Sequence, residues 1–291
     1  MFNPSGQQSA YGGFGGESGW YGYGVDGLRI DATETGVYTI AIVGITSYNA
    51  VTGTRTFAIQ QGTTVRSDYA LGTVVTESQT GLADTAIYRF TLNEPQDLWF
   101  NLSGASYHRA TLVRTDMPAT VFSDASITST NTGRRLSLTA GTYELRIRST
   151  EPNAGSFRVQ ISATENLPFL TLGETATTVV SEGRFASAWR LDGAAGQQLL
   201  IDPRVVSGSS SQSWRLIGPS GELIASGSQS GQSDSSRRVT LPEEGRYVLF
   251  LYQGATVTTP RTSTMRVTQY VEPTVAVTLG SQVSGSIAAP G

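Results

Sequence analysis

Three stretches of the chain share one pattern of polar and apolar positions. They run over residues 27–42, 134–147 and 237–251, and each has a polar start, a short apolar run, a turn with glycine and a second alternating run that opens with tyrosine. An apolar side chain at every second position is the period of a β-strand with one buried face. Each stretch is therefore predicted to form two strands joined by a tight turn.

The turn of each stretch carries a glycine two positions before the tyrosine. The pairs are Gly36 and Tyr38, Gly141 and Tyr143, and Gly245 and Tyr247. Glycine permits a positive φ in the turn, and tyrosine can bury its ring while its hydroxyl reaches back to a turn carbonyl. We predict a structural tyrosine corner at all three places.

The corners recur about every 105 residues, which is an ordinary size for one domain. Other alternating runs surround them, with turn signals about every 8–14 residues and no helical periodicity of useful length, as expected of a β-sandwich. The fold class predicted is all-β, a tandem array of antiparallel β-sandwich domains. Residues 67–168 and 169–274 are predicted to be complete repeats.

The two ends of the chain are predicted to be partial repeats. Pro4-Ser5-Gly6 resembles Pro219-Ser220-Gly221, a turn in the middle of the second complete repeat. Residues 1–66 are therefore interpreted as the C-terminal half of a repeat, and residues 275–291 as the start of a further one. This interpretation favours a fragment of a longer protein.

Composition narrows the classes of function and partner. The formal charge is −3 and all 20 basic residues are arginine, so nothing indicates a nucleic-acid partner. Cysteine is absent, which excludes disulfides, and no apolar run approaches the roughly 20 residues that a membrane span needs. Abundant Ser, Thr and Gly with 15% charged residues are typical of secreted all-β modules. We predict an extracellular or cell-surface location without membrane insertion.

No catalytic constellation is visible in the sequence. His108 is the only histidine, and we interpret it as a solvated loop residue because no nucleophile motif accompanies it. Glu243 and Glu244 are adjacent in a turn, so they do not face each other across a cleft. We predict no enzymatic activity, no catalytic residues and no resident cofactor or metal. Calcium bound by the loop residues Asp116, Asp124 and Asp234 is kept as an alternative.

Two features of the sequence point to contact surfaces. Arg134-Arg135 and Arg237-Arg238 occupy equivalent positions in the two complete repeats, so they are predicted to lie on a sheet surface or at a domain junction. A Gly-rich stretch over residues 11–27 carries Trp20, Tyr21 and Tyr23. These aromatic side chains are interpreted as part of a loop that packs between domains, or as a platform for stacking on sugar rings.

The combined motifs resemble a known family. Gly221, Leu241, Gly245 and Tyr247, with Leu138, Gly141 and Tyr143 in the preceding repeat, are similar to positions of the pre-peptidase C-terminal type of bacterial β-sandwich. Such modules occur in tandem in giant secreted surface proteins, including adhesins and haemolysin-like proteins. The resemblance implies a stalk or a substrate-binding accessory role without catalysis. Some relatives bind calcium through clustered acids, but no such cluster is evident here.

The leading hypothesis is a non-catalytic spacer in a large extracellular bacterial surface protein, adhesin or filament, whose partners are neighbouring repeats of the same chain or filament. One alternative is a glycan-binding accessory module that uses Trp20, Tyr21 and Tyr23 to stack on cell-surface glycans. Another is the non-catalytic tail of a secreted hydrolase.

Overall fold

A computed structural model describes most of the residues between Gly62 and Val271. The described residues are 3–5, 35–40, 62–81, 84–105, 107–127, 133–150, 154–180, 186–205, 212–229, 236–253, 261–271, 278–280 and 282. The aromatic residues Trp20, Tyr21 and Tyr23 lie outside this part, so their predicted role stays a prediction.

The first nine strands form two sheets, which we call the first sandwich. They are β1 (Thr64–Asp68), β2 (Val74–Gln79), β3 (Thr85–Leu92), β4 (Gln96–Gly104), β5 (His108–Arg114), β6 (Ala119–Ser126), β7 (Arg134–Leu138), β8 (Gly141–Ser149) and β9 (Gly155–Ala163). One sheet has the order β1-β3-β8-β5-β6 and the other β2-β9-β4-β7.

The remaining strands form the second sandwich. They are β10 (Thr175–Val180), β11 (Ser187–Gly193), β12 (Gln198–Val205), β13 (Gln212–Ile217), β14 (Leu223–Gln229), β15 (Arg237–Thr240), β16 (Gly245–Gln253) and β17 (Arg261–Gln269). One sheet has the order β11-β16-β13-β14 and the other β10-β17-β12-β15. The predicted all-β fold is confirmed.

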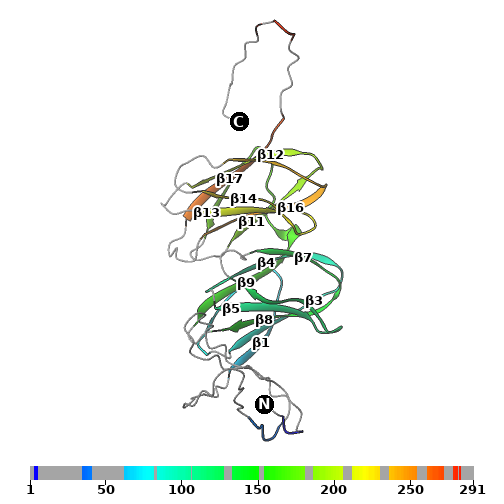
Figure 1. The fold of residues 1–291 in the computed structure, drawn as a ribbon, viewed down its shortest axis with the longest axis vertical. Helices are drawn as coiled ribbons and strands as arrows, with labels where there is room; N and C mark the ends of the chain where they lie inside the picture. The colour runs from blue at the N-terminus through cyan, green and yellow to red at the C-terminus, as the bar shows by residue number, and fades with distance from the viewer. Residues whose placement is uncertain are drawn as a thin grey trace, which may run out of the picture.

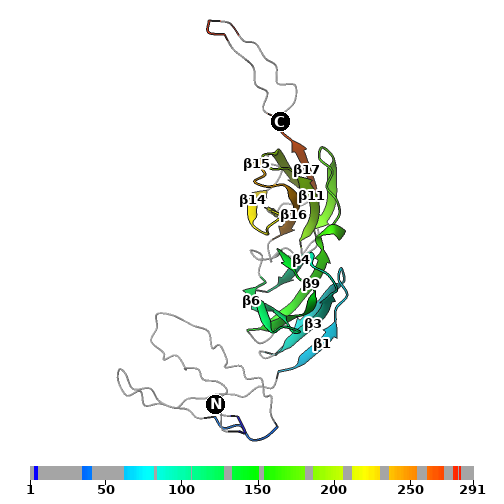
Figure 2. The same cartoon turned by 90° about the vertical axis from the view of Figure 1, so that its right-hand side faces the viewer.

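The four sheets follow one another along the long axis of the molecule (Figures 1 and 2). The sheet β2-β9-β4-β7 of the first sandwich faces the sheet β11-β16-β13-β14 of the second. A three-residue 3₁₀ helix, η1 (Thr164–Asn166), begins directly after β9 and starts the connection to the second sandwich. The described part of the chain has no helix with the length and apolar character that a membrane crossing requires.

Alternation along the strands explains the two cores. In β3, Tyr88, Phe90 and Leu92 point inward and are almost fully buried, whereas Arg89 between them is exposed. Each core is a separate cluster of buried apolar side chains, one within the first sandwich and one within the second. Burial of this kind is the main source of folding free energy, at roughly 25 cal/mol per Å² of apolar surface.

The strand β1 was not anticipated. It crosses the predicted boundary between residues 66 and 67 and pairs in parallel with β3, in the register Asp68 with Arg89. All other strand pairs of the two sandwiches are antiparallel within the described residues. β1 therefore joins the first sandwich along one edge of its outer sheet.

The interpretation of His108 as a solvated loop residue was wrong. Its side chain is fully buried at the start of β5, and its ring centroid lies 5.3 Å from that of Phe157. Burial lowers the pKa of His108, and the carbonyl groups of Ala105 and Gly155 oppose this only in part. His108 is thus a neutral residue of the core.

Candidate functional site

The junction between the two sandwiches combines a buried aromatic cluster with hydrogen bonds from an amide and a guanidinium. Trp99 points outward from β4, away from its own core, and is 1% exposed because the second sandwich covers it. Its ring centroid lies 4.7 Å from that of Phe250, and Ala186, Ile217 and Val248 complete the buried cluster. Aromatic pairs in contact stabilise by about 0.5–1.5 kcal/mol beyond the area that they bury.

A glycine makes room for the Trp99 side chain. A Cβ atom on Gly133 would lie 2.2 Å from Cη2 of Trp99, well inside the contact distance of two carbon atoms. Any larger residue at position 133 would force the indole to move. The residue before β7 is therefore part of the junction, although it carries no side chain.

Asn101 connects the two sandwiches through backbone hydrogen bonds. Its Nδ2 donates to the carbonyl of Ala186 at 2.8 Å, and its Oδ1 accepts from the N–H of Ala186 at 3.2 Å. Ala186 immediately precedes β11, where the pairing with β16 ends. The Asn101 side-chain amide therefore supplies hydrogen-bond partners for both the N–H and the carbonyl of Ala186. Asn101 is 1% exposed, and buried polar groups need such partners.

Arg135 provides the charged contact of the junction. It lies beside Trp99 on the outer face of the sheet, in register with it across β4 and β7. Its guanidinium donates to Asp97 of the first sandwich at 2.5 Å, to the carbonyl of Gly218 at 3.0 Å and to the carbonyl of Arg246. The side chain is 3% exposed, so an arginine that binds both sandwiches is almost completely removed from solvent.

The ionisation of Asp97 follows from this arrangement. Burial acts to raise its pKa. Hydrogen bonds from Ser137 and Arg135, with the charges of Arg135 and Arg246, lower the pKa by more than burial raises it. The net effect holds the pKa of Asp97 below its ordinary value. The ion pair of Asp97 and Arg135 therefore persists in mildly acidic solution.

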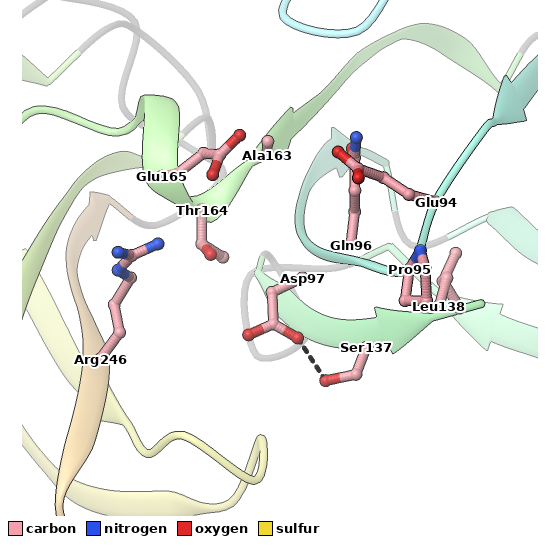
Figure 3. Close-up of a pocket in the computed structure, with 10 residues that line it drawn as sticks. All are labelled: Glu94, Pro95, Gln96, Asp97, Ser137, Leu138, Ala163, Thr164, Glu165 and Arg246. Carbon is pink, nitrogen blue, oxygen red and sulfur yellow. Dashed lines mark hydrogen bonds between the residues drawn. The ribbon is translucent and has the colours of Figure 1, made fainter. Parts of the chain in front are cut away.

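An open pocket of about 320 Å³ lies beside the junction (Figure 3). Asp97 and Arg246 face it from the two sandwiches, with Glu94 and Glu165 on the rim. Among the described residues, no three or more histidine, cysteine or acidic side chains converge to hold a metal ion. We interpret the pocket as the open side of the interface.

The connection between the sandwiches is itself paired with strands. Phe169 forms a parallel bridge with Arg190 of β11, and the N–H of Leu170 donates to the carbonyl of Arg190 at 2.8 Å. The Arg190 guanidinium in turn donates to the carbonyl of Leu167 at 3.1 Å and lies over the Phe169 ring. Residues 164–170 therefore leave little freedom for one sandwich to swing against the other.

The predicted tyrosine corners of the two sandwiches have a common geometry. The hydroxyl of Tyr143 donates to the carbonyl of Thr139 at 2.9 Å, and that of Tyr247 to the carbonyl of Glu243 at 2.6 Å. Burial raises the pKa of Tyr247, although the hydrogen bond with Glu243 works in the other direction. Both rings are almost completely buried.

The corner glycines are required by φ and by space. Gly36, Gly141 and Gly245 have φ values of +151°, +155° and +147°. A Cβ atom would lie 2.7 Å from Pro4 at Gly36 and 2.7 Å from Pro219 at Gly245. The same contact in both places agrees with the similarity between the two Pro-Ser-Gly turns. Tyr38, which follows Gly36, is half-buried.

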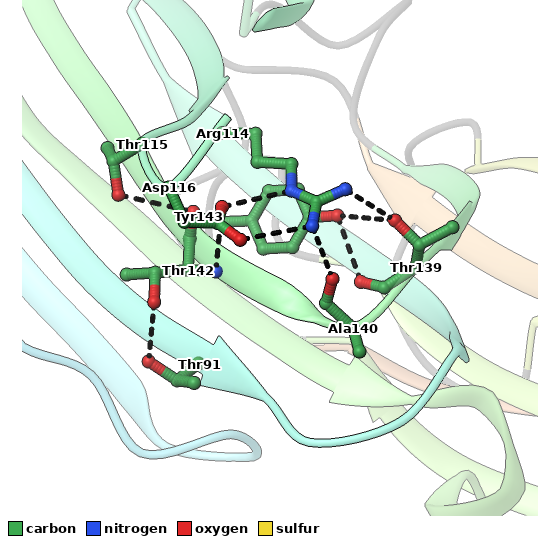
Figure 4. A network of polar contacts seen from close by, with 8 residues as sticks. All are labelled: Thr91, Arg114, Thr115, Asp116, Thr139, Ala140, Thr142 and Tyr143. Atoms are coloured by element: carbon green, nitrogen blue, oxygen red, sulfur yellow. Dashed lines mark hydrogen bonds and ion pairs between the residues drawn. The ribbon is translucent and has the colours of Figure 1, made fainter. Parts of the chain in front are cut away.

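In the first sandwich, Arg114 takes the place beside the corner glycine Gly141 that Pro219 takes beside Gly245 in the second (Figure 4). The Arg114 guanidinium lies over the Tyr143 ring and donates to Asp116, to the Ala140 carbonyl and to the Thr139 hydroxyl. The hydrogen bond from Arg114 lowers the pKa of Asp116 to about 2. The corner thus keeps its hydrogen bond while its packing partner changes.

The acids considered for calcium have other partners. Asp116 pairs with Arg114, and Asp124 pairs with Arg148. Asp234 lies outside the described residues. The calcium alternative therefore gains no support from Asp116 and Asp124.

Sequence reasoning placed the two arginine pairs on a sheet surface or at a domain junction, and Arg135 lies at the junction. It missed Trp99, Asn101 and Phe250. A signal was present, because Leu98-Trp99-Phe100 and Val248–Leu251 are continuous apolar runs. A strand that is apolar on both faces is buried on both faces. These runs mark the sheets that meet at the junction.

No family model matches the chain, and no curated protein matches it. Among solved structures, it is similar to the pre-peptidase C-terminal domain of collagenase from Bacillus anthracis, with 14% identity over 36% of this chain and 100% of that domain, at a TM-score of 0.29.

Two longer matches have the same character. The PBSX exported protein XepA shares 10% identity over 68% of this chain and 87% of its own, at a TM-score of 0.22. A tandem CBM22 domain of a Paenibacillus barcinonensis protein shares 12% identity over 67% of this chain and 82% of its own, also at 0.22. Likenesses at such TM-scores carry no argument about what this chain does.

Proposed function

We propose that this chain is a stiff, non-catalytic spacer made of stacked β-sandwich repeats in an extracellular protein. The observation that carries the proposal is the junction, in which Trp99, Asn101 and Arg135 are all buried and all contact the second sandwich. Domains joined only by a flexible linker do not bury an aromatic, an amide and a guanidinium between them. The junction therefore fixes the direction from one repeat to the next.

The proposal includes a surface protein such as an adhesin or filament, in which the number of repeats sets the reach. It is supported by the composition and by the short, paired connection over residues 164–170. Attachment to a secreted hydrolase stays an alternative context for the same mechanical role. The glycan-binding alternative stays a prediction, because its three aromatic residues lie outside the described part of the chain.

The test is a distance measurement across the junction. The chain has no cysteine, so Met117→Cys and Leu223→Cys introduce one exposed spin-label site on each sandwich. Pulsed electron resonance should give one narrow distance distribution. Adding Trp99→Ala should broaden it, because the cluster that fixes the two sandwiches is lost.

Leu200→Ala is the matched control. Leu200 has the position in β12 that Trp99 has in β4, as their pairing with β17 and β9 shows, but it lies on the far face of the second sandwich. Its replacement should leave the distribution narrow. A distribution that is already broad without Trp99→Ala would refute the stiff spacer.

A further inference from the structure

The sheet β1-β3-β8-β5-β6 has an outer face turned away from the second sandwich (Figure 1). We propose that this face is the docking surface for the segment that precedes Gly62, residues 1–61, through ion pairs in place of apolar contacts. The inference rests on the proposed function and specifies how the first sandwich meets the preceding part of the chain.

The outer face occupies the same place in its sandwich as the face that covers Trp99. Arg146 of β8 pairs with Ile87 and Thr111, just as Phe250 of β16 pairs with Ala188 and Arg215. Both residues stand three positions after a corner tyrosine. The first sandwich therefore has an arginine, Arg146, at the position where the second sandwich has Phe250, whose ring contacts Trp99 in the junction.

The same exchange extends to the neighbouring positions. Val248 corresponds to Glu144, and Tyr252 corresponds to Arg148. Five arginines project from the outer face, with three acids among them: Arg66, Arg89, Arg109, Arg146 and Arg148, with Asp68, Glu144 and Asp124. The face is thus positively charged overall.

Two of the three acids on this face, Glu144 and Asp124, are already engaged in ion pairs. Glu144 is bound by Arg146 at 2.8 Å and by Arg66 at 3.5 Å, and Asp124 is bound by Arg148 at 2.5 Å. The arginines outnumber them, and Arg66 and Arg146 keep 66% and 44% of their side chains exposed. Guanidinium groups in this state are suited to receive further carboxylates.

The chain enters both sandwiches in the same way. Tyr69 donates its N–H to the carbonyl of Arg89 at 2.7 Å after β1 has paired in parallel with β3. Leu170 makes the equivalent bond to Arg190 after the parallel bridge at Phe169. An entry strand with the same register and direction delivers the preceding segment to the same face of each sandwich.

Charge identifies the preceding segment as a suitable occupant. Residues 1–61 contain four acids, Glu17, Asp26, Asp31 and Glu34, against two arginines, Arg29 and Arg55. A net negative segment is therefore tethered next to a net positive face. Tethering raises the effective concentration to the millimolar range for a short connection, which favours this segment over a free partner.

A second copy of the chain fits less well. Its free face would present Leu200, Asp202 and Arg238, but Asp202 is already paired with Arg204 at 2.9 Å. Arg238 lies over the ring of Tyr270 at 4.1 Å. Docking of this face would require both contacts to be given up or shared.

The experiment compares two distances in the full chain. One labelled protein carries Val37→Cys and Met117→Cys, which are exposed positions on the preceding segment and on the first sandwich. The other carries the Met117 and Leu223 labels described above. At low salt, the Val37–Met117 distribution should be narrow. In about 1 M NaCl, where the Debye length falls to roughly 3 Å, it should broaden several-fold in width.

The Met117–Leu223 distribution should not change with salt, because its interface is a buried aromatic cluster whose one ion pair, Arg135 with Asp97, has its arginine almost completely buried. Such buried pairs are screened much less than exposed ones. Arg146→Gln with Arg148→Gln should broaden only the first distribution, with the thermal unfolding midpoint as a check that the sandwich still folds. A Val37–Met117 distribution that is broad at low salt, or unaffected by the two glutamines, would overturn docking of residues 1–61. Dependence on protein concentration would overturn it in favour of a second copy. Broadening of the Met117–Leu223 pair would instead count against the stiff spacer.

Discussion

The two sandwiches have similar interiors and different outer faces. Both have a tyrosine corner, alternating strands and a parallel entry segment, yet the face that carries Phe250 in one carries Arg146 in the other. Inward positions maintain the fold of each repeat, and outward positions determine what each repeat contacts. A repeat can therefore change what its outer face contacts without altering its core.

The largest loss of stability should come from replacing Trp99, which is buried in the junction, whereas its equivalent Leu200 in the second sandwich lies on the far face. Trp99→Ala should lower the free energy of unfolding by about 3 kcal/mol or more, because a buried indole leaves a cavity. Leu200→Ala, at the equivalent position of the second sandwich, should cost less than about 1 kcal/mol since Leu200 is only half-buried. Urea denaturation followed by circular dichroism measures both, and equal losses would contradict the comparison.

The next effect concerns the equivalent arginines Arg135 and Arg238. Arg135→Ala removes a buried guanidinium together with its hydrogen bonds to two carbonyls and to Asp97, which should cost about 2–3 kcal/mol. Arg238→Ala removes a contact with the Tyr270 ring, worth about 0.5–1 kcal/mol at an exposed site. Denaturation midpoints of the two variants give the comparison. A larger loss for Arg238→Ala would show that charge burial at the junction is not stabilising.

The tyrosine corners should respond alike in the two sandwiches. Tyr143→Phe and Tyr247→Phe each remove one hydroxyl that donates to a turn carbonyl, at a cost of about 1 kcal/mol. The ring and its packing are retained in both variants. An unchanged denaturation midpoint for either variant would argue against a stabilising corner at that position.

The smallest expected effect is the dependence of stability on pH that comes from the one histidine, His108. The pKa of His108 is lowered from 6.5 by burial, so the unfolded chain takes up its proton at a higher pH than the folded chain. Stability from the neutral ring is complete above about pH 6.5 and is lost as the pH falls below that value. His108→Gln, which does not titrate, should be less sensitive between pH 7 and 5.5 in thermal unfolding. Identical pH slopes for the two proteins would contradict this.

Much of the fold follows from local patterns in the sequence. The spacing from Gly141 to Tyr143 indicates the corner because a positive φ and a buried ring suit these residue types. The alternation from Tyr88 to Leu92 indicates which side chains enter the core. Such features depend on near neighbours in sequence, so they can be predicted without coordinates.

The junction depends on residues that are distant in sequence. Trp99 and Phe250 belong to different sandwiches, and no local pattern shows that the two rings meet. The apolar runs around them indicate burial on both faces, but not by which partner. His108 was misplaced for a simpler reason: it alternates with Ala110 and Leu112, which places it inward, although the neighbouring turn residues suggested a loop.

The front-to-back contact of sheets at Trp99 has a consequence for how such a column grows. Packed sheets lie about 10 Å apart, so a repeat of two layers lengthens the column by only about 20 Å. Each layer also presents a different surface above and below, so the column has a direction and no twofold axis at its joints. Each added repeat therefore adds little length, and all repeats point in the same direction along the column. The wide cross-section of the column resists bending.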